Sequence, residues 1–159
     1  MATTQSPPRL HTLTPGLVLR GCARAIAFYE RALGAEQVMR MDAPGGNAVW
    51  HAELRVGDSI FFLGDEAPGM GRRAPTPEQP SPMALWVSVP DCDAAYRRAL
   101  DAGAVSTMPP ADMFWGDRVA GVADPFGYHW SFAQKVKEMT ADEMRRAGEA
   151  WAAQHMPKK

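Results

Sequence analysis

Three side chains could together act as ligands of one metal ion: His51, Glu53 and His129. His51 and Glu53 are two residues apart in a segment of strand character, so their side chains share one face of that strand. With His129 they would offer the imidazole and carboxylate ligands that suit zinc or manganese, and hence Lewis-acid chemistry. Strand facing alone does not bring His51 within reach of His129. We therefore favour the structural alternative, in which Glu53 pairs with Arg55 or a neighbouring strand and His129 is hydrogen-bonded in a polar pocket.

Asp117 and Arg118 are a second pair with the chemistry of a site. Adjacent strand residues point to opposite faces, so the two do not face each other as an acid and a base would. We expect them to form separate ion pairs that fix a hairpin; the alternative is that Asp117 accepts a hydrogen bond near a cavity mouth. Gly69 and Gly71 lie among prolines, with no strand before them or helix after them, so they do not form a nucleotide-binding loop.

The composition narrows the classes of function. The 159 residues are 46% hydrophobic and 22% charged, which is typical of one globular domain or two small units with one core. A net charge of -1 provides no attraction for nucleic acid or an anionic membrane. Cys22 and Cys92 lie in helical apolar patterns, so we expect buried free thiols and no disulfide. The first residues lack a signal-peptide pattern and no run approaches the ~18 apolar residues of a membrane span, so we expect a cytoplasmic protein.

A stretch rich in proline and glycine divides the chain. Residues 65–82 contain five prolines and two glycines, which disfavour regular structure and indicate a linker. We expect a loose N-terminal tail at 1–12, a first module at 13–64, a second module at 83–134, and a C-terminal helix and tail at 135–159.

The two modules show the same order of elements. In each, the pattern predicts one strand, a helix with a glycine stop at Gly34 or Gly103, and three further strands. Both helices begin near a cysteine and end in Gly-Ala, about 70 residues apart, which indicates an internal repeat. We expect Asp91 to cap the second helix. The expected strands are 13–20, 36–42, 48–56 and 60–64, then 83–89, 104–108, 114–124 and 128–134.

The C-terminal segment has the signature of a separate helix. Thr140 and Glu143 have the spacing of a capping box, and Met144, Ala147 and Trp151 form a narrow apolar stripe. A helix of this length is marginally stable alone, so we expect it to dock on the body or on a second subunit.

Several phrases in this order resemble one superfamily. AIAFYERALGAE, HAELRVGDSIFFLGDE, MFWGDRVAGVADPFGYHWSF and MTADEMRR are similar to the vicinal oxygen chelate proteins, which include glyoxalases, bleomycin-resistance proteins and extradiol dioxygenases, and most of all to the PhnB-like branch. The resemblance runs from about Leu13 to Gln134. It implies an α+β fold in which two tandem βαβββ modules form a curved mixed sheet around a central cavity, and it implies a homodimer.

The resemblance also implies where a metal would bind. Matching the phrases places the family's four ligand positions at Thr14, Phe62, Ala84 and Ser131. None of these side chains is an imidazole or a carboxylate, so we expect no metal at this site. A divalent metal stays an alternative only through a displaced site of His51, Glu53 and His129.

The same frame predicts an aromatic binding slot. Trp86 is two residues beyond Ala84, so it shares the inward face with Ser88. The predicted ligand-binding residues are Phe62, Trp86, Ser88, Trp115, His129 and Ser131. We expect a small-molecule-binding protein that sequesters or acts on an apolar or aromatic ligand. The alternative is a metal-dependent lyase, isomerase or dioxygenase, and the sequence leaves open whether any reaction is catalysed.

Overall fold

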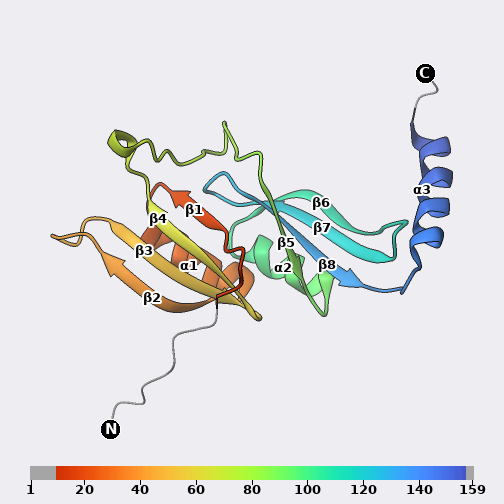
Figure 1. Ribbon diagram of the computed structural model, residues 1–159, viewed down its shortest axis with the longest axis horizontal. Helices are drawn as coiled ribbons and strands as arrows, with labels where there is room; N and C mark the ends of the chain where they lie inside the picture. Colours follow the sequence, from red (N-terminus) through yellow and green to blue (C-terminus); the bar gives the residue numbers. More distant parts are fainter. Residues whose placement is uncertain (1–9, 157–159) are drawn as a thin grey trace, which may run out of the picture.

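The computed structural model describes residues 10–156 as two modules of the same design, followed by a helix (Figure 1). Each module is a four-stranded sheet with one helix packed on it. The first module comprises β1 (Gly16–Leu19), α1 (Cys22–Leu33), β2 (Glu36–Asp42), β3 (Val49–Val56) and β4 (Ser59–Asp65). The second comprises β5 (Ala84–Ser88), α2 (Cys92–Asp101), β6 (Val105–Asp112), β7 (Asp117–Ala123) and β8 (His129–Lys135). The final helix is α3 (Ala141–His155).

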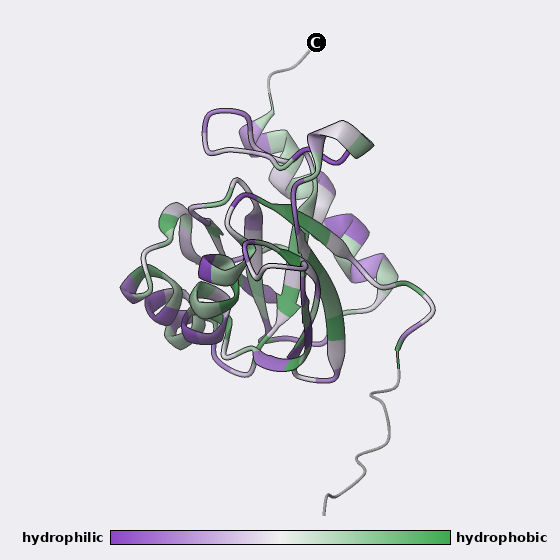
Figure 2. Ribbon diagram, turned by 90° about the vertical axis from the view of Figure 1, so that its left-hand side faces the viewer, coloured by the Kyte–Doolittle hydropathy of each residue, from purple (hydrophilic) through white to green (hydrophobic). Residues whose placement is uncertain are grey.

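The two sheets have matching topologies. Their strand orders are β1-β4-β3-β2 and β5-β8-β7-β6, with one parallel pair in each, β1 with β4 and β5 with β8. The first strand of each module is therefore an edge strand. Figure 2 shows α1 and α2 together on one side of the strands, and the two helices contact each other. The α+β fold of two repeated βαβββ modules is confirmed.

The helices end and begin where the sequence predicts. Gly34 closes α1 with φ 66°, and the Asp91 side chain caps α2 by accepting from the Ala94 N–H. The buried face of α1 includes Cys22, Ile26, Tyr29 and Leu33. In α2 the fully buried residues after Cys92 are alanines, and the larger Tyr96 and Leu100 are only partly buried. The small alanines let α2 lie close to its sheet.

Both cysteines are free and buried, as predicted. Burial, together with the charge of Asp65, raises the pKa of the Cys22 thiol to about 12. Burial also raises the pKa of Cys92. Neither thiol is therefore a nucleophile at neutral pH.

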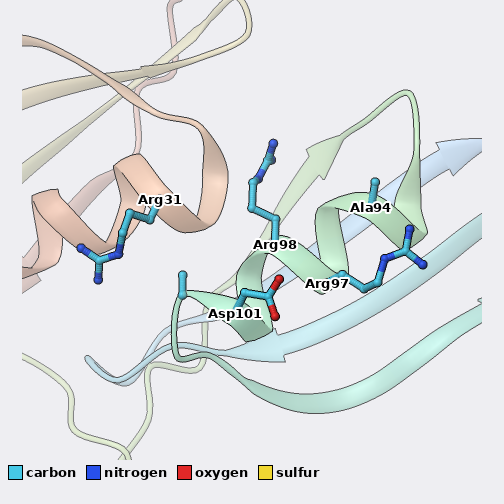
Figure 3. A pocket seen from close by; sticks show the side chains of 6 residues that line it. Arg31, Ala94, Arg97, Arg98 and Asp101 are labelled. Atoms are coloured by element: carbon cyan, nitrogen blue, oxygen red, sulfur yellow. The ribbon is translucent and has the colours of Figure 1, made fainter.

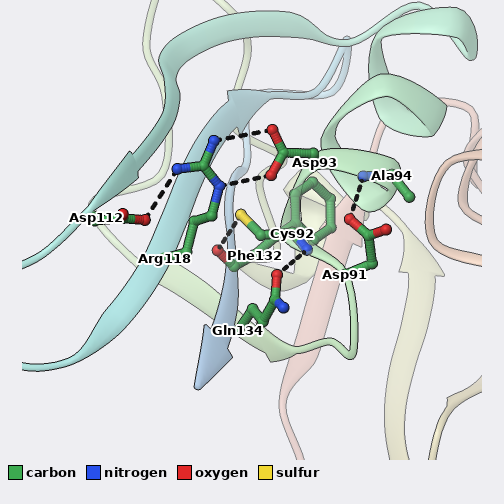
Figure 4. A network of polar contacts seen from close by, with 8 residues as sticks. All are labelled: Asp91, Cys92, Asp93, Ala94, Asp112, Arg118, Phe132 and Gln134. Carbon is green, nitrogen blue, oxygen red and sulfur yellow. Dashed lines mark hydrogen bonds and ion pairs between the residues drawn. The ribbon is translucent and has the colours of Figure 1, made fainter. Parts of the chain in front are cut away.

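Ion pairs fix the N-terminal end of α2 to the second sheet (Figure 4). Arg118 donates to both carboxylate oxygens of Asp93, at 2.6 and 3.0 Å, and to Asp112 at 2.9 Å. These hydrogen bonds lower the pKa of Asp93 and raise that of Arg118. Asp117 instead pairs with Lys135 at 2.6 Å. The expected separate ion pairs of Asp117 and Arg118 are confirmed.

One buried carboxylate joins the two modules. Asp124, 4% exposed, follows β7, and its Oδ2 accepts from the Tyr29 hydroxyl of α1 at 2.7 Å and from Trp130 Nε1 at 2.9 Å. Its Oδ1 accepts from the backbone N–H groups of Phe126 and Tyr128. Burial and the neighbouring carboxylate raise the pKa of Tyr29 well above its usual value. Asp124 thus holds the turn between β7 and β8 against the first module.

Some local expectations are wrong. Residues 65–82 carry a short 3-10 helix, Pro68–Met70, and two isolated bridges, because local hydrogen bonds form between the prolines. Residues 114–116 belong to a turn before β7 and not to the strand, since Gly116 has φ 93° and its N–H bonds back to Met113. Most of the expected tail, residues 1–9, lies outside the described residues, as do 157–159 of the C-terminal end.

The helix α3 stands away from the two sheets (Figure 1). Its predicted capping box of Thr140 and Glu143 is present, and none of its residues is buried. Trp151 packs near Phe114, with ring centroids 5.8 Å apart, and remains 45% exposed. None of the helices within residues 10–156 combines the length and the apolar character that crossing a membrane requires.

Replacing Asp124 should weaken the contact between the modules and destabilise the protein. In Asp124→Asn an amide N–H₂ faces donors that need an acceptor, so we expect the free energy of unfolding to fall by about 3 kcal/mol. Tyr29→Phe removes one donor and leaves the other three, so it should cost about 1 kcal/mol. Urea unfolding measures both values. Equal losses in the two variants would show that Asp124 does not act as the shared acceptor.

Candidate functional site

Within residues 10–156, one helix packs on one face of each sheet and leaves the other face without a helix. In the first sheet Met39 pairs with Glu53 across β2 and β3, and Met41 pairs with His51. Residues paired across strands share a face. Phe62 of β4 pairs with Glu53 and lies beside His51, with ring centroids 4.9 Å apart. This face therefore carries the predicted residues His51, Glu53 and Phe62.

His51 and Glu53 interact with each other. His51 Nε2 lies 3.2 Å from Glu53 Oε1, whereas Arg55 pairs with Glu36, so the expected pairing of Glu53 with Arg55 is wrong. His129 is on β8 in the second sheet and is not part of this pair. Within residues 10–156 no group of three or more histidine, cysteine, aspartate or glutamate side chains is placed to hold a metal ion.

The four positions at which the resemblance implies metal ligands match between the modules. Phe62 and Ser131 occupy equivalent places, because each lies on the strand next to its module's edge strand, opposite Gly16 and Trp86 respectively. Thr14 and Ala84 precede these two partners by two residues. Two hydroxyls, a phenyl ring and a methyl group do not fit zinc, nickel or iron. The donor set at these positions therefore does not fit the metal.

Four residues form a row across the uncovered face of the second sheet, and the two in the middle have small side chains or none. Trp86 pairs with Ser131, Ser131 with Gly121, and Gly121 with Met108. Trp86 is 58% exposed. The space beside Gly121 is filled, because a Cβ at that position would lie 2.7 Å from the Thr107 hydroxyl oxygen, so this row leaves no hollow at its centre.

A cavity of about 590 Å³ lies between the modules, beside the open edge of β5. We call it the inter-module cavity. Its apolar lining includes Leu33, Phe61, Leu85, Val87 and Trp130, and the predicted residues Trp86 and Ser88 line it as well. Because β5 is an edge strand, side chains from both of its faces reach the same cavity. Its volume is that of a small-molecule site.

Polar groups lie around the rim of the inter-module cavity. They include His11, Asp58, Ser59 and Arg98. A His11 ring nitrogen lies 3.1 Å from the Asp58 carbonyl oxygen. Arg98 donates to the carbonyls of residues 32 and 33, the last residues of α1. The cavity thus combines an apolar wall with a few polar groups, the usual make-up of a ligand pocket.

The structure brings only some of the predicted ligand-binding residues together. Trp86 and Ser88 share the inter-module cavity, and Ser131 is beside Trp86. His129 lines a different hollow, with prolines of the linker. Phe62 lies on the other sheet. Trp115 is at the turn before β7, where its Nε1 donates to Asp117 at 2.9 Å, away from the other five.

Strand alternation did not identify the rest of the lining. Phe61, Trp130, Leu85 and Val87 alternate with the residues predicted to line the slot, so the pattern places them in the core. Ser59 also lines the cavity and was not among the predicted ligand-binding residues. Aligning the two repeats would have found it, because Ser59 occupies the place that Tyr128 has in the second module.

The corresponding edge of the first module is closed. The Tyr128 hydroxyl accepts from the Val18 N–H at 3.0 Å and donates to the Val18 carbonyl at 2.9 Å. Burial raises the pKa of Tyr128. One phenol group therefore satisfies both outward backbone groups of Val18 on β1.

A separate hollow with a mainly basic lining lies between α1 and α2 (Figure 3). Arg31 of α1 and Arg97, Arg98 and Asp101 of α2 line it. In Figure 3 Arg97 and Arg98 point in different directions, so their charges do not converge on one point. Arg98 is bonded to the C-terminal carbonyls of α1, which is a structural role.

The fold and cavity define a protein built from two paired βαβββ modules, and comparison with known sequences gives the family. The chain belongs to the glyoxalase/bleomycin resistance protein/dioxygenase superfamily, whose sequence model matches residues 9–132. An uncharacterized protein of Mycobacterium bovis is 41% identical over 138 residues, which are 85% of this chain and 90% of that protein.

Solved structures show the same fold. A gene product of Arabidopsis thaliana is 26% identical and superposes with a TM-score of 0.62, over 79% of this chain and 99% of that one. A Bacillus cereus protein described as a putative 3-demethylubiquinone-9 3-methyltransferase, PhnB protein, is 18% identical with a TM-score of 0.59, over 78% and 99%. Both are similar in fold to this chain.

Removing the Tyr128 hydroxyl should open the edge of β1. In Tyr128→Phe the N–H and carbonyl of Val18 lose their partner, so we expect unfolding to need about 1–2 kcal/mol less free energy. The Val18 amide should also exchange its hydrogen faster, which NMR in D₂O measures. The Leu17 amide points to the other side of β1 and serves as the control. Unchanged exchange at Val18 would contradict the closed edge.

Proposed function

We propose that the protein binds an apolar or aromatic small molecule in the inter-module cavity and sequesters it without a metal ion. The observation that carries the proposal is the exposed Trp86 ring at a cavity whose other walls are mostly apolar. Aromatic rings at a concave apolar surface favour flat apolar ligands. The phrases at 51–66 and 113–132 support a place in the PhnB-like branch.

The proposal of metal-free binding is supported by the donor sets. Thr14, Phe62, Ala84 and Ser131 do not fit a transition metal. The pair of His51 and Glu53 favours a second candidate, a displaced metal site with metal-dependent lyase, isomerase or dioxygenase activity. This candidate needs a third ligand, and a pair is a weak site for zinc.

Trp86 should contribute to binding of an aromatic probe. We expect Trp86→Ala to weaken the binding of naphthalene about tenfold, because the variant loses ring contacts and buried apolar area. Trp50→Ala is the matched control, since Trp50 is 56% exposed and lies on β3 of the other sheet, outside the cavity lining. Calorimetric or NMR titration measures both affinities.

Metal removal provides the second control for the same experiment. Protein treated with EDTA should bind naphthalene as tightly as untreated protein. A stoichiometric metal that is lost in His51→Ala, together with a binding loss on EDTA treatment, would instead favour the metal-dependent candidate. Equal weakening by Trp86→Ala and Trp50→Ala would contradict the position of the site.

We also propose that the protein forms a homodimer through the uncovered face of the first sheet. Met39 and Met41 on that face are 41% and 49% exposed. Monomers rarely leave contiguous apolar patches in water, and a second copy presents a matching face.

Sedimentation velocity tests this assembly. We expect a species of twice the 17.3 kDa chain mass, and we expect Met41→Glu to convert it to monomer because a charge would be buried at the interface. Met70→Glu is the control, since Met70 is 82% exposed on the linker. A wild-type monomer at high protein concentration would contradict the proposal.

A further inference from the structure

The two modules pack against each other with approximate twofold symmetry. Phe62 and Ser131 are equivalent, because they lie opposite the equivalent edge-strand residues Gly16 and Trp86. The residues that precede them, Phe61 and Trp130, are therefore equivalent as well. Their rings contact each other, with centroids 5.7 Å apart. In a twofold arrangement equivalent residues meet at the axis. The helices α1 and α2, also equivalent, contact each other.

This symmetry predicts what should lie opposite Tyr128. Tyr128 of the second module reaches Val18 of β1. The residue equivalent to Tyr128 is Ser59, because Ser59 pairs with Val56 as Tyr128 pairs with Asp124. The residue equivalent to Val18 is Ser88 of β5. Ser59 should therefore face Ser88, and both do line the inter-module cavity.

The cavity thus occupies the place of a missing aromatic side chain. In one half of the molecule a tyrosine fills the space between the modules and bonds to the edge strand. In the other half a serine stands at the same position, and its side chain is too short to reach β5. The apolar wall of Phe61 and Trp130 is present in both halves, since these two residues lie at the axis.

Ser88 on the edge strand β5 presents its backbone N–H and carbonyl as the equivalent Val18 does on β1. The Val89 N–H donates to the Ala133 carbonyl at 2.9 Å, so odd-numbered residues of this parallel strand bond to β8. Ser88 therefore directs its N–H and carbonyl to the open side. Among residues 10–156 no hydrogen bond to either group is formed.

We propose that the inter-module cavity selects ligands that carry a phenolic hydroxyl. The aromatic ring takes the place of the missing tyrosine ring, and the hydroxyl accepts from the Ser88 N–H and donates to the Ser88 carbonyl. This assignment rests on the proposed function of the cavity, and it names the chemical class of ligand. The Tyr128–Val18 contact of the same chain provides the geometric precedent.

Three related probes test the proposal. Naphthalene reports binding in the cavity, 2-naphthol adds the hydroxyl, and 2-methoxynaphthalene keeps the oxygen without a proton to donate. We expect 2-naphthol to bind about tenfold more tightly than naphthalene, and 2-methoxynaphthalene to bind no better than naphthalene. Proton–nitrogen NMR titration gives the affinities, and 2-naphthol should shift the Ser88 amide resonance where naphthalene does not.

Two variants locate the site. Ser59→Tyr restores the aromatic side chain that the symmetry predicts, so it should abolish binding of all three probes and raise the Tm by about 3 °C. Trp50→Ala, at a residue outside the cavity lining, should bind all three probes as the wild type does. Ser88→Pro removes an N–H that makes no bond to β8, which an edge strand tolerates. It should reduce the preference for 2-naphthol over naphthalene, because only the bond to the carbonyl of residue 88 remains.

The outcomes separate the two levels of the argument. Equal affinities for 2-naphthol and naphthalene in the wild type would overturn the phenol assignment and leave the proposed apolar site standing. Failure of all three probes to bind would overturn both. A preference for 2-naphthol that is undiminished in Ser88→Pro, or that persists in Ser59→Tyr, would place the hydroxyl elsewhere and would also overturn the assignment.

Discussion

The buried carboxylate of Asp124 is the contact on which the arrangement of the modules depends. Burial of a charge is unfavourable unless donors surround it, and Asp124 has four, from α1, from Trp130 and from its own turn. The bond to Tyr29 fixes the second module against the first. The two backbone bonds shape the turn that carries Tyr128 to the edge of β1.

A small difference in turn length makes the two halves of the molecule unequal. Between equivalent residues, the turn from Val56 to Ser59 has two residues, and the turn from Asp124 to Tyr128 has three, which include Gly127 at φ 90°. A Cβ on Gly127 would lie 2.8 Å from the Thr76 backbone, so the linker also packs on the longer turn. The longer turn and the residue after it supply the aromatic side chains of Phe126 and Tyr128, which fill the space on one side of the approximate twofold axis. The shorter turn leaves the equivalent space on the other side hollow.

The sequence pattern predicted the order of the elements because hydrophobic period, capping residues and glycine stops agree in both modules, and the family resemblance supplied the arrangement of the sheets. Asp91, Gly34, Thr140 and the two free cysteines are where the pattern predicts them. The prediction for the site was less complete. Trp86 and Ser88 share a cavity, yet Trp115 is held by Asp117 at a distant turn. Alternation along a strand specifies a face, and it does not specify how two faces approach each other.

The position of the cavity explains this limit in physical terms. A pocket on a sheet face takes side chains of one parity, whereas a pocket at an open edge takes both parities and the backbone as well. At β5 the cavity therefore meets Leu85 and Val87 together with Trp86 and Ser88. Backbone N–H and carbonyl groups are present at every residue, so no residue type marks them in the sequence. The signal lies instead in the comparison of repeats, where a serine in one module stands for a tyrosine in the other. A small side chain at a symmetric contact thus leaves a cavity, and the ligand site that we propose there needs no added catalytic or chelating group.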